Sequence, residues 1–495
     1  MITDLQGLHV LAGTVSTVDG VQYAAVQTDQ GAAVAVLGQP EHLREFEGTV
    51  TDWQSAQLLV GPPSMRNMAA LRRALSWLRP RPLGLRTSVG FGDRLGLATP
   101  GHIAAMRAHG AGLSPIFAQQ SIREMDRTHR SARQVVDDAT WAVFCSGWRE
   151  GFGTDADHLK TEADVERCLP VGYTMWTIDP GDHVDVTADA ANLEQLHDRF
   201  QRLPWSDLAD TPEGCLRRYR DARFPIEEHD LLMDEASAVR AAVKYGRAIA
   251  HTCKLVASIQ TRLKSEGWEL EVAVDETEPV TSHLEHIYIV LELQRLGVEM
   301  LSFAPRYLGE FEKGIDYIGD LKAFERDLAV HAAIARQLGP YKLSLHSGSD
   351  KFSIFDIAAR ETRGVVHLKT AGTSYVEALR TVASLDPPLF RDIYTVARAQ
   401  FENARRGYHI SARLERTPAP ETVHDADLPT LLDQPDARQL LHVTYGQVLA
   451  AQDESGRGPL GARLLGALQA APDAYVARLE AHFAGHLAPF AAWAK

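Results

Sequence analysis

Cysteine is scarce in this sequence, with only four residues in a chain of 495. They are Cys145, Cys168, Cys215 and Cys253, and no two of them form a C-x-x-C pair. Zinc knuckles and disulfide-stapled folds depend on closely spaced cysteines, so the spacing argues against both. We therefore expect four free thiols in a fold that is held together by its core.

Long apolar runs are also missing. No window approaches the roughly 18 uninterrupted apolar residues that a membrane span requires. Residues 1–7 (MITDLQG) carry neither the basic segment nor the apolar segment of a secretion signal. We therefore expect a cytoplasmic protein with no membrane partner.

Positive charge is in deficit, because 65 acidic residues outnumber 51 Lys and Arg and give a formal net charge of -14. Nucleic-acid binding is driven by clustered basic residues that neutralise phosphates, so no nucleic-acid partner is expected. A negatively charged small substrate would need basic side chains gathered locally at its site.

Nucleotide-binding and hydrolase motifs are absent. The sequence contains no G-x-x-x-x-G-K-[ST] phosphate loop and no G-x-S-x-G nucleophile elbow. The glycines of residues 90–101 have the spacing G-x-G-x-x-x-G, and a Leu-Ala-Thr-Pro segment interrupts the expected start of a helix. This departs from the dinucleotide fingerprint and argues against nucleotide binding.

Short β runs with hairpin signals open the chain. Residues 8–15, 21–28 and 32–38 are rich in Val and Ala and are separated by DG and DQG turns. We predict a small β-rich cap over residues 1–80. Pro80, Pro82 and Gly84 then mark a change of pattern.

Brief apolar runs alternate with longer segments of helical period after residue 80. The runs are residues 84–92, 113–120, a run ending near Asp157, 173–179, 270–276, 298–305, 341–346 and 365–369, with 408–412 as a further candidate. Strands that are apolar throughout and alternate with helices indicate a parallel sheet covered by helices. We predict an α/β fold, a TIM-like (β/α) barrel over residues 81–415.

Two helical regions lie outside the regular alternation. Residues 187–268 are too long for one barrel helix and contain a continuous helical pattern at 236–267, which predicts a helical insertion. Residues 416–495 are rich in Ala and Leu with helical spacing and predict a C-terminal helical segment. That segment is also a candidate contact for a homo-oligomer.

Polar residues that follow the apolar runs are the site candidates, because active sites of such barrels lie where strands end. Asp157 and His158 are adjacent, and adjacent strand residues point to opposite faces unless the chain turns there. In the functional interpretation His158 ligates a metal and Asp157 is an acid or base. The alternative is a turn in which Asp157 caps the next helix.

Two more histidines follow strand-like runs. His346 ends the run YKLSL at an abrupt change to SGSDKF, a position that suits a metal ligand. His367 shares a strand face with Lys369 by the two-residue period. A single histidine at a strand end is more often a hydrogen-bonded structural residue, and only its recurrence at several strand ends favours a metal site.

Carboxylates and basic residues complete the candidate set. Asp275 and Glu276 follow the run LEVAV, and we select Glu276 as the second acid/base, although both could instead be N-terminal charges of the helix at 283–297. The candidates to hold a substrate carboxylate are Arg306, Lys313, Lys351 and Lys369.

Several blocks of the sequence resemble the tagaturonate epimerase family, over most of residues 85–415. They are residues 90–102, 119–128, 155–161, 274–286, 304–320, 341–355 and 367–375. The resemblance implies reversible C4 epimerisation of a six-carbon keto-uronate, with a divalent metal bound by histidines. Among Zn, Mn, Ni and Co, such ligands give no strong preference.

The resemblance also implies residue roles. Asp157 would be the proton acceptor beside the metal ligand His158, with His346 as a further ligand and His367 as the preferred third histidine. Glu276 is the preferred donor. The remaining substrate-binding candidates are Glu124, Glu312 and Ser347, the two glutamates also being held in reserve as donors.

The chemistry of C4 restricts the mechanism further. A ketone at C2 acidifies the hydrogen on C3 but not the hydrogen on C4, so inversion at C4 is easier by retro-aldol cleavage of C3–C4 and re-addition. A metal-dependent aldolase or a ketose isomerase would use the same barrel and metal. A carbohydrate-binding protein without catalytic activity is the alternative from another class, and it would need no stoichiometric metal.

Overall fold

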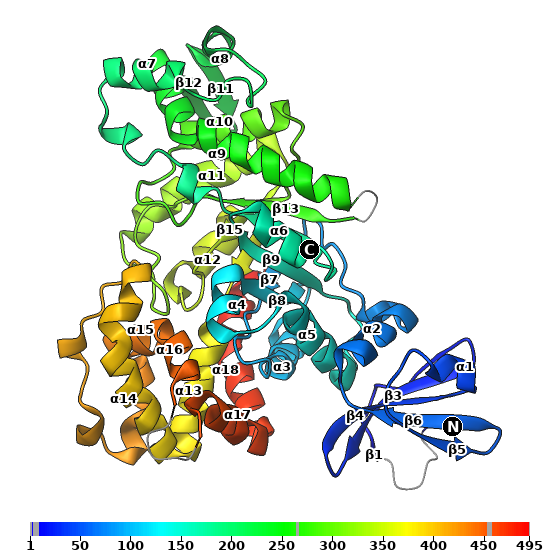
Figure 1. Cartoon of the computed structure of the whole chain (residues 1–495). Coiled ribbons are helices and arrows are strands. Elements are labelled where there is room, and N and C mark those ends of the chain that lie inside the picture. Colours follow the sequence, from blue (N-terminus) through cyan, green and yellow to red (C-terminus); the bar gives the residue numbers. More distant parts are fainter. Residues whose placement is uncertain (1, 3–8, 264–266, 453–457, 495) are drawn as a thin grey trace.

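The computed structural model describes residue 2 and residues 9–263, 267–452 and 458–494 (Figure 1). Its centre is a closed barrel of eight parallel strands that follow one another in chain order. They are β7 (Ser88–Gly90), β8 (Ser114–Ser121), β9 (Gly153–Leu159), β10 (Met175–Ile178), β13 (Glu269–Ala273), β14 (Ser302–Ala304), β15 (Lys342–Leu345) and β16 (Val366–Lys369). The predicted (β/α) barrel is confirmed.

Helices cover the outside of the barrel and alternate with its strands. They are α3 (Thr99–His109), the short α4 (Ile122–Thr128), α5 (Ala132–Ser146), α6 (Glu162–Cys168), α9 (Glu235–Arg262), α10 (His283–Arg295), α11 (Leu321–Leu338), α12 (Phe352–Glu361) and α13 (Thr373–Leu385). Many of them begin at a Ser, Thr or Asp that accepts a main-chain hydrogen bond, such as Ser282 before α10. The apolar layer between strands and helices forms one continuous core.

One predicted strand is wrong. Residues 408–412 form no strand and lie between two single-turn 3-10 helices. Their β-forming residues have no sheet edge to pair with, because β16 already closes the barrel against β7. The segment instead contributes Tyr408 and His409 to the wall of a pocket.

An antiparallel sheet forms the N-terminal region, as predicted. Its strands are β1 (His9–Val10), β2 (Ser16–Val18), β3 (Val21–Thr28), β4 (Gly31–Gly38), β5 (Thr49–Trp53) and β6 (Ala56–Gly61), and α1 (Pro40–Leu43) lies within it. The order is β1-β3-β4-β6-β5, with β2 paired to β3. Figure 1 shows this sheet to one side of the barrel, joined to it through α2 (Met65–Ala74).

A long excursion separates β10 from β13. It contains α7 (Leu193–Gln201), α8 (Pro212–Tyr219) and a hairpin of β11 (Ala222–Ile226) and β12 (His229–Met233), which the sequence pattern did not predict. The predicted helix at 236–267 is α9, although residues 264–266 lie outside the described part. None of the described helices has the length and apolar character needed to cross a membrane.

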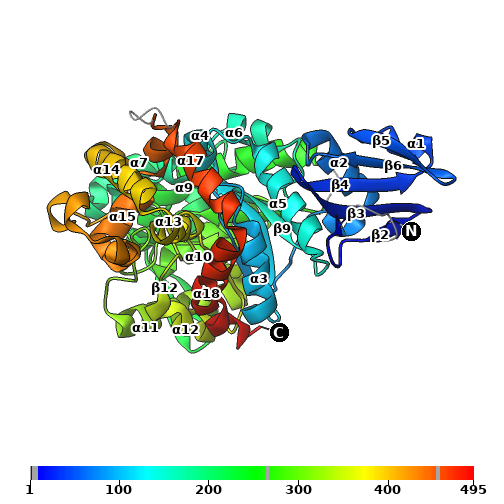
Figure 2. The ribbon, with the colours of Figure 1, turned by 90° about the horizontal axis from the view of Figure 1, so that it is seen from below.

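The C-terminal helices return to the beginning of the barrel. They are α14 (Pro387–Ala404), α15 (Pro435–Val443), α16 (Tyr445–Ala450), α17 (Leu460–Ala470) and α18 (Pro472–Ala491). α18 lies alongside α3, which follows the first barrel strand (Figure 2). Gly101 permits this close approach, because a Cβ there would lie 2.6 Å from Leu479 Cδ1 and 2.7 Å from Leu479 Cβ.

Gly101→Ala should therefore destabilise the protein, by about 1–3 kcal/mol, because the added methyl group overpacks the contact with Leu479. The matched control is Gly466→Ala in α17, where an added Cβ would meet nothing within 4 Å. That control should be neutral or stabilising by about 0.4–1 kcal/mol. Denaturant unfolding of both variants measures the difference, and equal stabilities would contradict the tight α3–α18 packing.

Candidate active site

A buried ammonium group lies at the centre of the barrel. Lys369 Nζ is 2.8 Å from Asp155 Oδ2, 2.6 Å from Asp157 Oδ1 and 2.7 Å from Glu271 Oε1. It also donates to Thr177 Oγ1 at 2.7 Å. Burial alone would lower the pKa of Lys369, but the carboxylates more than offset this and raise it well above its usual value. Lys369 is therefore a charged residue enclosed by acidic ones.

Strand alternation explains how these groups meet. Asp155 and Asp157 are two residues apart in β9, so both side chains point into the barrel. Burial raises the pKa of Asp155 to about 7, although Lys369 opposes the shift. Three carboxylates, Asp155, Asp157 and Glu271, therefore surround the one ammonium of Lys369. This excess of acidic groups favours the binding of a further cation.

A backbone irregularity brings His158 to the same place. The pairing of β9 with β10 shifts register between Trp176 and Ile178. His158 has a φ of 55°, in the left-handed region that few non-glycine residues adopt. The turn allows Asp157 and His158 to face one site although they are adjacent, and His158 Nδ1 lies 2.7 Å from Asp157 Oδ1.

Three potential metal-ligand atoms converge beside this turn. One ligand atom from each of His158, Asp275 and His346 lies within 4.8 Å of the others. Asp275 Oδ1 is 3.0 Å from His346 Nδ1 and 3.9 Å from His158 Nε2. All three atoms are buried, yet none has an aligned hydrogen bond to any residue that the structure describes. Their directions fit a shared ion better than pairwise bonds.

Each of the two imidazoles, of His158 and His346, has a carboxylate on the ring nitrogen that faces away from the potential metal site. His346 Nε2 is 2.6 Å from Glu271 Oε1, and His158 Nδ1 is bonded to Asp157. A carboxylate on the far nitrogen fixes the orientation of a metal-ligating imidazole. Burial alone would lower the pKa of His346, but Asp275 and Glu271 raise it to about 10. The residues present therefore fit a divalent cation, which would replace a proton at His346.

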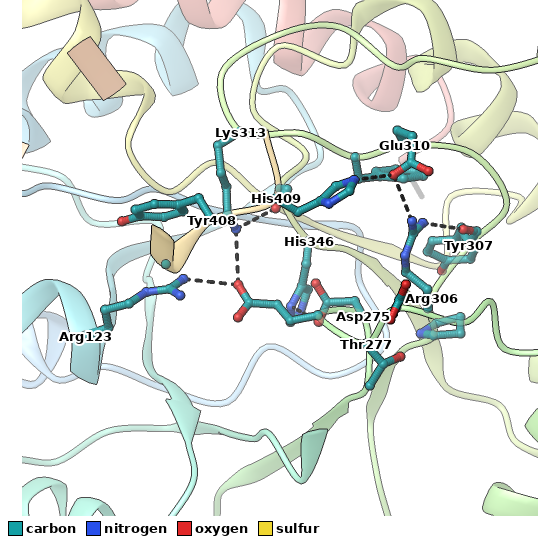
Figure 3. Close-up of a pocket in the computed structure, with 16 residues that line it drawn as sticks. Arg123, Asp275, Thr277, Arg306, Tyr307, Glu310, Lys313, His346, Tyr408 and His409 are labelled. Atoms are coloured by element: carbon teal, nitrogen blue, oxygen red, sulfur yellow. Dashed lines mark hydrogen bonds and ion pairs between the residues drawn. The ribbon is translucent and has the colours of Figure 1, made fainter. Parts of the chain in front are cut away.

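A pocket of about 550 Å³ opens above these ligands (Figure 3). Figure 3 shows Arg123 and Lys313 pointing toward the part of the pocket where Asp275 and His346 lie. Between them is Glu276, whose Oε1 is 3.1 Å from Arg123 and 3.4 Å from Lys313. Arg123, Glu276 and Lys313 therefore form a charged group in the pocket wall near Asp275 and His346.

A narrower space continues below this pocket. It is lined by Asp157, His158 and Lys369 and shares Glu276 and His346 with the wider part. A bound molecule could therefore reach the carboxylate network from above.

Other predicted substrate-binding residues lie in this pocket wall. Lys313 Nζ donates to Ser347 Oγ at 2.6 Å, so these two are brought together. Glu124 lines the narrow space and is bound by Arg94 at 2.7 Å. Arg306 lines the wide pocket, but its guanidinium donates to the carbonyls of its own loop and pairs with Glu310 at 3.1 Å.

Two predicted substrate-binding residues have structural surroundings instead. Lys351 is buried and donates to the carbonyl oxygens of Glu312 and Ile315. The Glu312 carboxylate accepts from the amide and hydroxyl of Ser411, at 2.8 Å each. Among the described residues, neither of these two lines the wide pocket or the narrow space. Together they hold the loop that carries Lys313.

The structure does not bring His367 to the three ligand atoms. His367 points into the barrel like Lys369 but lies two residues earlier in β16, which is one layer deeper. Its Nδ1 is 2.9 Å from Ser88 Oγ, and burial lowers its pKa to about 3. Among the residues described, Asp275 and not His367 is grouped with His158 and His346.

Sequence reasoning did not select Glu271 or Arg123, which the structure places at this site. It named Asp275 but did not group it with His158 and His346. Glu271 had a signal, because Glu269, Glu271 and Asp275 recur at even spacing in an otherwise apolar strand. That period would also have favoured Asp275 over Glu276 as the inward residue. Arg123 had no such signal, because it lies in a short helix rather than after an apolar run.

Comparisons with known proteins agree over nearly the whole chain. The tagaturonate epimerase family profile matches residues 13–490. The tagaturonate/fructuronate epimerase of Thermotoga maritima is 42% identical over 446 residues, which cover 90% of each chain. The native crystal structure of fructuronate-tagaturonate epimerase from Cohnella laeviribosi is 36% identical with a TM-score of 0.91, covering 98% of this chain and 97% of that one. Its complex with one glycerol gives the same TM-score and identity.

Lys369→Met should destabilise the protein by about 3–5 kcal/mol, because it leaves Asp155, Asp157 and Glu271 buried around an apolar side chain. The matched control is Lys322→Met on the exposed face of α11, which should change stability by less than about 0.5 kcal/mol. Denaturant unfolding near pH 7 measures both. Wild-type stability of Lys369→Met would show that the ammonium is not what holds the carboxylates in place.

Proposed function

Because this chain belongs to the tagaturonate epimerase family, we propose that it interconverts tagaturonate and fructuronate by inverting C4 of the keto-uronate. It is an isomerase. The observation that carries the finer proposal is the convergence of buried ligand atoms from His158, Asp275 and His346 at the base of the pocket. A carbohydrate-binding protein would have no need of that arrangement.

The first part of the proposal is a divalent cation, Zn, Mn, Ni or Co, held by these three residues. The surrounding excess of carboxylates over Lys369 favours a cation electrostatically. When bound, such an ion supplies Lewis-acid stabilisation to the oxygens of the reacting sugar. Asp157 and Glu271 keep the two imidazoles oriented toward it.

The second part concerns the bond that changes. Removing the proton of the C4 hydroxyl while C3–C4 breaks gives two three-carbon fragments, an enediolate and an aldehyde that carries the substrate carboxylate. The aldehyde turns over, C3–C4 forms again on its other face, and the proton returns to the C4 oxygen. Nothing is oxidised or lost, so the atoms balance as an epimerisation requires.

Two carboxylates are placed to exchange that proton. Burial alone would raise the pKa of Glu276, but Lys313, His158 and Arg123 lower it. Glu276 is therefore ionised in the free enzyme and can donate only a proton that it has first accepted. Asp157 is ionised for a similar reason, since His158 and Lys369 lower its pKa despite burial. Asp157 and Glu276 both line the narrow space, and Glu276 also lines the wider pocket. We propose that a sugar bound there lies between the two carboxylates, so that each serves one of its sides.

The substrate carboxylate needs a cation away from the reacting carbons. Lys313 and Arg123 are the cations directed into the pocket, and both are partly exposed there. Lys369 and Lys351 are enclosed by their own partners. We therefore propose Lys313 as the principal carboxylate-binding residue, with Arg123 beside it. Arg306 also lines the pocket, but its guanidinium is held by its own loop.

Chelation should abolish epimerisation of fructuronate to tagaturonate, and added metal should restore it. His346→Ala should lose the active-site metal, whereas His367→Gln should keep it, because His367 lies a layer deeper. Metal analysis of each variant, with chromatographic separation of the two epimers, tests this. Full activity of demetallated protein in chelator would overturn the metal-assisted mechanism, and release of fragments or a moved carbonyl would indicate an aldolase or a ketose isomerase.

Glu276→Gln and Asp157→Asn should each lower kcat by about 10²–10⁴-fold, because they keep the shape of the side chain but remove proton transfer. Metal content should stay unchanged in Glu276→Gln. If Asp157 acts mainly by orienting His158, Asp157→Asn should lose metal as well as activity.

The same acid/base assignment is checked in deuterated water. If C3–C4 cleavage operates, the product should carry no deuterium on C4, because the C4 hydrogen never leaves its carbon. Deuterium at C4 would instead establish direct deprotonation, with the two carboxylates still in place.

Lys313→Met should weaken uronate binding by about 1.5–3 kcal/mol, the worth of a hydrogen bond to a charged group. An uncharged ketose such as tagatose should be affected much less. The comparison variant is Arg306→Met, whose guanidinium is already bound within its own loop. Parallel loss of kcat/KM on both sugars in Lys313→Met would assign Lys313 a structural role.

A further inference from the structure

A second group of metal-ligand side chains lies outside the barrel, between α10 and α11. It consists of His283, the first residue of α10, and Asp327 and His331, which are one turn apart on α11. One ligand atom from each residue lies within 4.8 Å of the others. These residues take no part in the proposed epimerisation.

The distances within this group suit a small divalent cation. His283 Nε2 is 3.0 Å from Asp327 Oδ1, and His331 Nε2 is 3.8 Å from Asp327 Oδ2. Ligands at about 2.0–2.2 Å from a tetrahedral zinc ion would be separated by similar distances. The side chains of His283 and Asp327 are 27% and 18% exposed, so an ion could enter from solvent.

Two of these atoms are buried without an aligned partner. His331 is fully buried, and within residues 9–263, 267–452 and 458–494 neither its Nε2 nor Asp327 Oδ2 makes a hydrogen bond. The main chain of Thr281 also lies within hydrogen-bonding reach of the His331 ring, and the main chain of Leu308 lies within reach of the Asp327 carboxylate. His283 Nε2 also approaches the Asp327 carbonyl at 3.3 Å. A buried nitrogen or carboxylate oxygen without an aligned hydrogen bond lowers the stability of the fold unless a ligand binds it.

A hydrogen-bonded chain behind His331 can free its Nε2 for an ion. His331 Nδ1 is 2.8 Å from His286 Nδ1, and His286 Nε2 is 2.7 Å from the Tyr341 hydroxyl. If His331 donates from Nδ1, its Nε2 carries a lone pair directed at Asp327.

A third cluster, Asp350, His482 and His486, has the same residue types, but its ligand atoms are hydrogen-bonded within the protein. His482 Nε2 is 2.7 Å from Asp350 Oδ1, and Arg438 donates to Asp350 Oδ2 at 2.8 Å. His486 Nε2 accepts from the Asp350 amide at 3.0 Å. Each of these ligand atoms already has a protein partner, which makes this group a hydrogen-bonded network. It serves as the internal comparison.

We propose that His283, Asp327 and His331 form a second, structural binding site for a divalent cation of the zinc type. The ion would join the start of α10 to α11. The loop before α10 carries Asp275 and Glu276, and the loop before α11 carries Lys313. The second site would therefore brace both active-site loops from outside the barrel without touching the substrate.

Zinc stoichiometry tests the proposal. Full-length protein expressed with zinc and freed of loose metal should contain one more zinc ion than His283→Gln or Asp327→Asn, which nearly keep side-chain size. Both variants should keep basal epimerase activity and lose a few degrees of Tm in the presence of zinc. His482→Gln is the matched control and should keep all its zinc. His346→Ala should lose the active-site ion only.

These outcomes separate the two metal sites. If His283→Gln and Asp327→Asn hold as much zinc as the wild type, the second site does not exist, whatever His346→Ala shows. If His346→Ala loses no metal while those two variants do, the second site stands and the proposed active-site metal fails. Circular dichroism verifies folding, and if one variant misfolds the other still decides the stoichiometry.

Discussion

The ion contacts of Lys369 are the interaction on which the barrel interior depends. Its ammonium holds Asp157 and Glu271, and these carboxylates in turn hold the rings of His158 and His346. One lysine at the end of the last strand thus orients two histidines from different strands. Because the carboxylates outnumber the ammonium, the network both positions the two imidazoles and leaves negative charge around them.

Such an interior does not maximise stability. Enclosing an ammonium and several carboxylates costs desolvation free energy that an apolar barrel interior would avoid. The apolar layer between strands and helices and the close packing of α3 on α18 must offset that cost. The polar residues inside the barrel form the candidate active site, and the apolar residues outside it stabilise the fold.

The sequence predicted the barrel because its strands are apolar, short and separated by helices. It could not exclude residues 408–412, since strand-forming side chains do not reveal that the sheet is already closed. Strand ends located His158 and His346, but the left-handed turn that unites His158 with its neighbour is a backbone property without a sequence signature. The alternation of strand residues showed that the His367 side chain faces into the barrel, but it did not show how deep in the barrel that side chain lies. Only the structure could show that Asp275, and not His367, lies beside His158 and His346.

The return of α18 to α3 has a consequence for biosynthesis. α3 follows the first barrel strand, and its partner helix α18 lies hundreds of residues later in the sequence, so it is synthesised much later. The apolar surface of α3 around Gly101 therefore stays exposed while hundreds of residues are translated. During that time an unpaired apolar surface can make non-native contacts, because its native partner is far away in the sequence. A chain that terminates before α18 would leave this surface of α3 exposed, and with it an apolar area open to non-native contacts.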